Sequence, residues 1–184
     1  ESDLPNAFAA PFGFVFVTRG LLGLIENEAE LAFVLAHEIA HVEKRHGLQQ
    51  IIDGWDERER QNYKAHMLEL AERDGPLSEE HKEMSRRLSH LAMLVVQSKG
   101  KDHETESDLR GLELMSRVGY SPRAALSFID RLRSVAGGQS KEPDFFMTHP
   151  HLDDRYVITG NRLRGLRDSG QLLAERYQRI VRGR

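Results

Sequence analysis

The five residues His37-Glu38-Ile39-Ala40-His41 constrain this chain more than any other stretch, because they place two histidines four positions apart within a predicted helix. Residues four apart on a helix differ by about 40° around the axis and about 6 Å along it, so both imidazoles project from one face and can bind one metal ion. Glu38 lies about 60° from His41, where its carboxylate can reach a water molecule at the metal without binding the metal itself. The H-E-x-x-H spacing therefore predicts a metal site with a general base beside it.

The helix around this motif is predicted from its ends and from its apolar stripe. Asn27 is a suitable N-cap, and Glu28 begins a first turn in which the helix dipole favours negative charge. Gly47 stands where a glycine would end the helix. Apolar residues recur on one face, at Leu31, Val34, Leu35, Ile39 and Val42. Half-buried packing histidines are the alternative reading, but a motif in the middle of an apolar helix favours a buried metal site.

Composition limits the ligands and the partners. The 184 residues suit one domain with a sizeable core, and none of them is cysteine, so only histidine and carboxylate side chains remain as strong metal ligands. The net charge of −3 gives no support for a nucleic-acid partner. Apolar runs such as 14–17 and 91–96 are far too short to span a bilayer. The chain begins at Glu1 without a signal-peptide pattern, which indicates either a processed form or a trimmed sequence.

Residues 6–24 are predicted to form β-structure, because aromatic and β-branched side chains are concentrated there. The main strand covers 12–18, and residues 6–8 form a preceding strand or its edge. Such a sheet could merely cover the core, or its edge could hold an extended peptide beside the metal cleft by strand addition. In the second case the substrate-binding residues would be Phe14, Val15 and Phe16.

The rest of the chain is predicted to be helical, which gives an α+β fold that is mainly α. Expected helices after the motif cover 48–73, 78–96, 103–118, 121–135, 153–167 and 171–182. The charged run 56–60 is typical of a solvated helix face, and the segment 53–100 is assigned no role. The glycine pair 137–138 predicts a flexible connection to the aromatic-flanked segment 145–150, which contains His149.

A catalytic zinc site needs a third protein ligand, and the residues just after His41 do not supply it. The extended pattern H-E-x-x-H-x-x-G-x-x-H is excluded, because Lys44 and Gly47 occupy the positions of its glycine and its last histidine. His46 falls about 100° away from the required face and is interpreted as a cation at the helix C-terminus.

A glutamate from a later helix is the remaining option, and Glu104 is the best candidate. Asp108 follows four residues later, so one carboxylate can bind the metal while the other accepts the N–H of a ligand histidine. Glu106 lacks such a partner because Arg110 occupies the equivalent position. An acidic first turn stabilised by the helix dipole is the alternative for both carboxylates.

Taken together, these motifs resemble those of the M48 family of zinc metallopeptidases over nearly the whole chain. They are Asn6-Ala7-Phe8, Gly13 to Leu22, Glu30-Leu31-Ala32, His37 to His41, Glu104-x-x-x-Asp108, Gly111 to Met115, Gly119-Tyr120-Ser121-Pro122, and Thr148-His149-Pro150 followed by Arg155. Each motif is weak alone, and their common order is specific. The resemblance implies a single M48-type peptidase domain over residues 1–184, with a zincin-like fold in which a small β-sheet lies beside the H-E-x-x-H helix.

The resemblance also implies the metal site by position. His37, His41 and Glu104 would bind one Zn²⁺ per chain. Glu38 would be the general base, and Asp108 would accept the N–H of a ligand histidine without binding the metal.

Two further residues receive roles from the resemblance. His149 and Arg155 would act in catalysis as donors to the oxyanion or to the substrate backbone. Their alternatives are a loop histidine and a structural arginine paired with a carboxylate. His149 could also bind the metal as a fourth ligand and exclude water.

The implied function is hydrolysis of peptide bonds by a zinc metalloendopeptidase of the gluzincin type, with unfolded or misfolded proteins as substrates. The chain resembles the exported bacterial branch of the family, which implies the periplasm or the outer-membrane periphery, peripheral membrane association and a role in envelope protein quality control. The alternative is a chaperone-like binding factor in which proteolysis is latent or secondary. A purely structural zinc site is disfavoured, because it would leave the carboxylate of Glu38 without a use.

Overall fold

The computed structural model describes residues 5–9, 14–53, 56–58, 61, 100–137, 149, 151–165, 170–181 and 183. Its strands are β1 (Ala7–Ala9) and β2 (Val15–Val17), and its helices are α1 (Arg19–Leu24), α2 (Glu28–Glu43), α3 (His46–Asp53), α6 (Lys101–Arg117), α7 (Arg123–Gly137), α9 (Leu152–Leu163) and α10 (Ala174–Val181). The fold is mainly α with a small antiparallel sheet, which confirms the predicted class.

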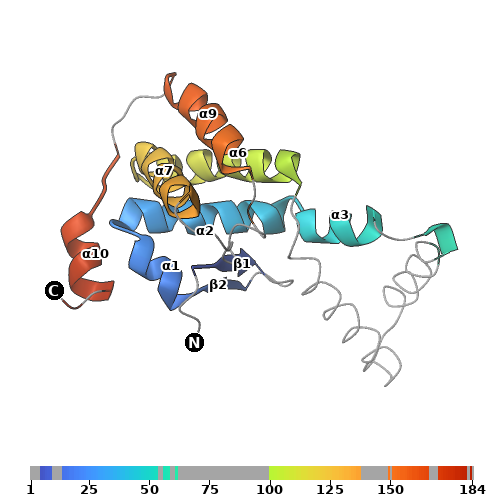
Figure 1. The fold of residues 1–184 in the computed structure, drawn as a ribbon, viewed down its shortest axis with the longest axis horizontal. Coiled ribbons are helices and arrows are strands. Elements are labelled where there is room, and N and C mark those ends of the chain that lie inside the picture. The colour runs from blue at the N-terminus through green and yellow to red at the C-terminus, as the bar shows by residue number, and fades with distance from the viewer. Residues whose placement is uncertain are drawn as a thin grey trace.

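Helix α2, which carries the H-E-x-x-H motif, lies at the centre of the structure. Figure 1 shows α6, α7 and α9 on one side of α2, and the sheet on the other. As predicted, Asn27 caps α2, and its side chain accepts a hydrogen bond of 3.0 Å from the backbone N–H of Glu30. Large buried side chains of α2, α6 and α7 meet in the core, among them Phe33, Leu112, Met115, Phe128, Ile129 and Leu132. The motif helix is therefore held by packing on both sides.

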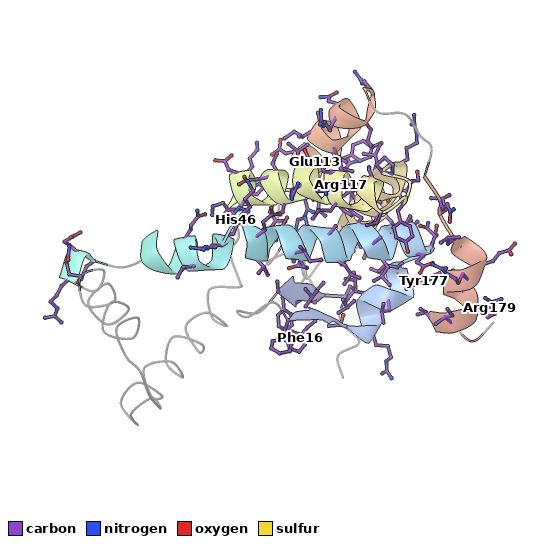
Figure 2. The ribbon with its side chains drawn as sticks, turned by 180° about the vertical axis from the view of Figure 1, so that it is seen from behind. Phe16, His46, Glu113, Arg117, Tyr177 and Arg179 are labelled. Atoms are coloured by element: carbon purple, nitrogen blue, oxygen red, sulfur yellow. The ribbon has the colours of Figure 1, made fainter. Side chains whose placement is uncertain are left out.

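The two strands pair with Ala7 opposite Val17 and Phe8 opposite Phe16. The rings of Phe8 and Phe16 stack with centroids 5.0 Å apart. Ala7 is buried, whereas Phe16 keeps about half of its surface exposed and points away from α2 (Figure 2). Residues 12 and 13 of the predicted strand lie outside the described residues.

Residues 19–24 form α1 rather than the predicted β-structure, so that part of the prediction is wrong. Thr18 explains the difference, because its hydroxyl oxygen accepts a hydrogen bond of 3.3 Å from the N–H of Leu21 and so caps a helix. Leu21 lies one helical turn before Leu24, and its side chain is completely buried. Local capping and burial together outweigh the β-propensity of the preceding residues.

Helix α2 ends at Glu43, not at Gly47 as predicted. Arg45 takes the left-handed conformation with φ of 58°, which is the role expected of the glycine, and Gly47 lies inside α3. The chain therefore turns earlier than predicted, and this places His46 at the first position of a new helix.

The later helices α6, α7, α9 and α10 begin and end within a few residues of their predicted bounds. Helix α3 covers the start of the predicted helix 48–73. The predicted helix 78–96, and most of the segment 53–100, lie outside the described residues. Within the described ranges, no helix is both long enough and apolar enough to cross a membrane.

Gly111 sets how closely α6 approaches α2. A methyl group added at Gly111 would lie 3.4 Å from the backbone nitrogen of His37 and from the ring of Phe33. We expect Gly111→Leu to push α6 away from α2 and to lower the free energy of unfolding by about 1–3 kcal/mol, measured by urea denaturation. Gly47→Leu is the control, because no atom of the described residues lies within 4 Å of a Cβ added there. Equal destabilisation by both substitutions would contradict this packing role.

Candidate metal centre

Two histidines of α2 and one glutamate of α6 converge in the core. The Nε2 atoms of His37 and His41 lie 3.0 Å apart. The carboxylate of Glu104 reaches both rings, with Oε2 3.5 Å from Nε2 of His37 and Oε1 3.2 Å from Nε2 of His41. His149 joins them, so that four buried residues offer ligand atoms within 4.8 Å of one another.

The orientation of His37 is fixed from behind by Asp108. Nδ1 of His37 lies 2.8 Å from Oδ1 of Asp108, so the ring N–H donates to the carboxylate. Burial by itself would raise the pKa of Asp108, but the guanidinium of Arg155 and the hydrogen bond from His37 outweigh it and lower the pKa. The ionised carboxylate therefore holds the proton of a neutral His37 ring on Nδ1 and leaves the Nε2 lone pair facing the cluster.

The cluster is arranged to hold a cation. Nitrogen and carboxylate acceptors are crowded together. Oε1 of Glu104, 3.2 Å from Nε2 of His41, is buried and has no hydrogen-bond partner among the described residues. Burial alone would lower the pKa of His37, but the charges of Glu104 and Asp108 outweigh it and raise the pKa, so the site favours positive charge. Two imidazoles and a carboxylate are a ligand set that zinc accepts. The residues present therefore fit a divalent metal.

Glu38 stands beside this cluster without belonging to it. Its side chain is buried, and its Oε1 lies 3.3 Å from Nε2 of His149. Glu38 lines the same small cavity as His37 and His149.

Arg155, from α9, binds the two carboxylates of α6. Its Nε and Nη2 each donate to Asp108 at 2.7 Å, and its Nη1 lies 2.9 Å from Oε2 of Glu104. The guanidinium of Arg155 is buried. Burial alone would lower the pKa of Arg155, but the charges of Asp108 and Glu104 outweigh burial and raise this pKa. These contacts favour a structural role for Arg155, paired with carboxylates, over a role as a donor to the substrate.

His149 closes the centre. Its Nε2 lies 3.1 Å from the backbone carbonyl oxygen of Ala7, which can only accept, and its Nδ1 lies 3.2 Å from Oε2 of Glu104. The carboxylate of Glu104 also only accepts, so a ring that makes both hydrogen bonds donates from both nitrogens, and Nδ1 must give up its proton before it can bind a metal. The remaining cavity, lined by residues that include His37, Glu38, His149 and Arg155, measures about 20 Å³, which is room for a single water molecule.

A sequence profile of peptidase family M48 matches residues 1–158. The chain belongs to peptidase family M48. This membership supports a metalloprotease function, in agreement with a cluster of histidine and glutamate side chains that could bind a metal ion.

The relatives of this M48 chain include proteases from mitochondria and from bacteria. The mitochondrial metalloendopeptidase OMA1 of Schizosaccharomyces pombe is 35% identical over 146 residues, which cover 79% of this chain and 40% of that protein. The beta-barrel assembly-enhancing protease of Yersinia pestis is 30% identical over 169 residues, and that of Escherichia coli is 28% identical over 176 residues; these cover 88% and 91% of this chain. The chain spans between a third and two fifths of the length of these relatives.

The predicted substrate-binding residues of the M48 chain lie on and beside β2. Phe14 and Phe16 are exposed, and Val15 pairs with Ala9. The strand that reaches the centre is β1, because the carbonyl oxygen of Ala7 contacts His149. The sequence instead assigns the edge beside the site to the strand 12–18, and the role of its three residues in substrate binding stays a prediction.

His46 departs from its predicted role. The sequence predicts a cation at the end of a helix, but His46 begins α3 and its side chain is buried. Burial lowers the pKa of His46 despite the nearby carboxylate of Glu106. Its Nδ1 lies 2.9 Å from Nδ1 of His41. Helical periodicity could not show this contact, because the turn at Arg45 interrupts the helix before His46.

Proposed function

We propose that this chain is a zinc metalloendopeptidase in which His37, His41 and Glu104 bind one Zn²⁺ and Glu38 is the general base. The observation that carries the proposal is the buried convergence of these three ligand side chains directly beside a fourth, acidic side chain that is not needed to bind the metal. A site that only stabilised the fold would have no use for that carboxylate.

The reaction would be hydrolysis of a peptide bond. Bound zinc would supply the lowered pKa of a water molecule and the polarisation of the scissile carbonyl. Glu38 accepts the proton that the attacking water loses, and it then donates this proton to the nitrogen of the leaving amine as the C–N bond breaks. Asp108 holds His37 in the required orientation, and Arg155 holds Asp108 and Glu104 in place.

The substrates we propose are unfolded or misfolded proteins, hydrolysed during quality control of the bacterial envelope. Support comes from the bacterial relatives, which are named beta-barrel assembly-enhancing proteases. We place the chain in the periplasm or at the periphery of the outer membrane on the same ground.

A second candidate function is binding of unfolded chains with proteolysis held latent. The closed centre favours it, because the cavity of about 20 Å³ beside His149 has no room for a peptide. In this form His149 must leave before a substrate can reach Glu38.

Cleavage of casein by the purified chain tests the main proposal, with zinc measured in the same preparation. We expect peptide products to form, to disappear after treatment with a chelator and to return when zinc is added. Capture of unfolded protein without any cleavage, in a preparation that carries zinc, would favour the binding function instead.

His149→Ala distinguishes a closing ligand from a catalytic donor. We expect casein cleavage to increase, because the substitution opens the cavity and frees the position that His149 occupies against Glu104 and Ala7. His149→Phe is the control, since it fills the same space without offering a lone pair to the metal. A loss of cleavage by tens- to hundreds-fold in His149→Ala would instead make His149 the oxyanion donor, and no change would contradict both roles.

A further inference from the structure

His46 packs against the back of a metal-ligand histidine. It is the first residue of α3, and its buried ring folds back onto His41 with the ring centroids 4.9 Å apart. Figure 2 places His46 where α2 and α3 meet. The left-handed backbone at Arg45 makes this contact possible, because it turns the chain sharply between the two helices.

The two rings meet through equivalent nitrogens, which fixes where their protons lie. Nδ1 of His46 and Nδ1 of His41 are 2.9 Å apart, so one must donate and the other accept. A neutral His41 that offers its Nε2 lone pair to the cluster carries its proton on Nδ1 and is therefore the donor. His46 then accepts at Nδ1 and carries its own proton on Nε2.

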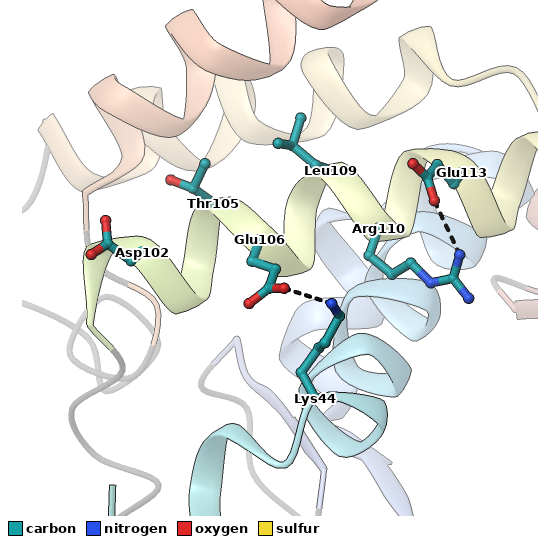
Figure 3. Close-up of a pocket in the computed structure, with 7 residues that line it drawn as sticks. All are labelled: Lys44, Asp102, Thr105, Glu106, Leu109, Arg110 and Glu113. Carbon is teal, nitrogen blue, oxygen red and sulfur yellow. Dashed lines mark hydrogen bonds and ion pairs between the residues drawn. The ribbon is translucent and has the colours of Figure 1, made fainter. Parts of the chain in front are cut away.

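The next contact agrees with this assignment. Nε2 of His46 lies 3.1 Å from Oε2 of Glu106, so the second ring donates to a carboxylate. The other oxygen of Glu106 lies 2.6 Å from Nζ of Lys44, at the side of a groove of about 490 Å³ on the outer face of α6 (Figure 3). The hydroxyl oxygen of Ser107 lies 3.3 Å from Nδ1 of His46 and faces the same lone pair.

We propose that His46 is a positioning residue for the metal centre: it accepts the Nδ1 proton of His41, is itself held by Glu106, and so keeps Nε2 of His41 directed at the metal. The inference rests on the proposed zinc site. The two ligand histidines are then oriented in different ways. His37 donates directly to the carboxylate of Asp108, whereas His41 donates to the imidazole of His46, which in turn donates to the carboxylate of Glu106.

Zinc affinity, measured by competition with a chromophoric chelator, tests this role without any assay of activity. We expect His46→Leu to weaken zinc binding by about 10- to 100-fold, the range seen when an outer partner of a metal ligand is lost. His46→Asn should retain most of the affinity, because its Oδ1 can replace Nδ1 as the acceptor for His41. Arg110→Met is the control, since Arg110 lines the same groove and pairs with Glu43 and Glu113 instead.

A measurement on the unsubstituted protein covers the case in which His46→Leu does not fold. In the zinc-loaded form, imidazole ¹⁵N NMR should show His46 with its proton on Nε2 and His41 with its proton on Nδ1. A proton on Nδ1 of His46, wild-type zinc affinity in folded His46→Leu, or equal losses in His46→Asn and His46→Leu would each overturn the inference. Failure of the unsubstituted chain to bind zinc would refute the proposed function instead.

Discussion

Glu38→Gln is expected to lower kcat for peptide hydrolysis by about 10²- to 10⁴-fold while leaving zinc content and fold unchanged. Glutamine has nearly the same shape as glutamate, but its amide cannot take the proton from the attacking water. Glu38 is buried beside the ligand cluster and is not one of its members, so its loss should not weaken the metal site. The assay is casein cleavage at equal zinc occupancy.

The control for Glu38→Gln is Glu43→Gln, at the last residue of α2. Glu43 pairs with Arg110 at the surface and lies outside the cluster, so its substitution should leave kcat unchanged. Near wild-type cleavage by Glu38→Gln would remove Glu38 as the general base and would point to a contaminating protease in the preparation.

Glu104→Ala should abolish stable zinc binding. Its carboxylate is the acidic member of the cluster. Burial alone would raise the pKa of Glu104, but His149, Arg155 and His37 outweigh burial and lower this pKa well below its usual range. In the proposed site, this substitution removes a metal ligand itself and not a residue that orients a ligand. We therefore expect zinc affinity to fall by more than the roughly 100-fold upper range for outer partners.

Metal analysis after gel filtration measures this loss, with Glu113→Ala as the matched control on the same helix. Glu113 is exposed and pairs with Arg110, so its removal should leave one zinc per chain. Full zinc content in Glu104→Ala would move the third ligand elsewhere, with His149, the remaining member of the cluster, as the next candidate.

The parts of the site that lie within one helix could be predicted from the sequence. His37 and His41 share a face of α2, and Glu104 and Asp108 share a face of α6, because residues four apart on a helix lie on the same side. The pairing of the two helices followed from chemistry, since a buried pair of histidine ligands needs a third ligand from elsewhere in the chain.

The contacts that depend on the turns between elements could not be predicted. His46 reaches His41 only because Arg45 adopts a left-handed conformation, which its side-chain type does not favour. His149 reaches the carbonyl of Ala7, 142 positions away, through an approach that no local periodicity encodes. Helix α1 differs from the predicted β-structure for a related reason, because the cap at Thr18 competes with the β-propensity of the residues before it.

Anomalous X-ray diffraction at the zinc edge, from crystals of the zinc-loaded chain, tests the central claim most directly. The proposed site predicts one peak per chain, about 2.0–2.2 Å from Nε2 of His37, Nε2 of His41 and a carboxylate oxygen of Glu104, with Glu38 beyond bonding distance. A peak bound by other side chains, or no peak in a chain that cleaves casein, would contradict it.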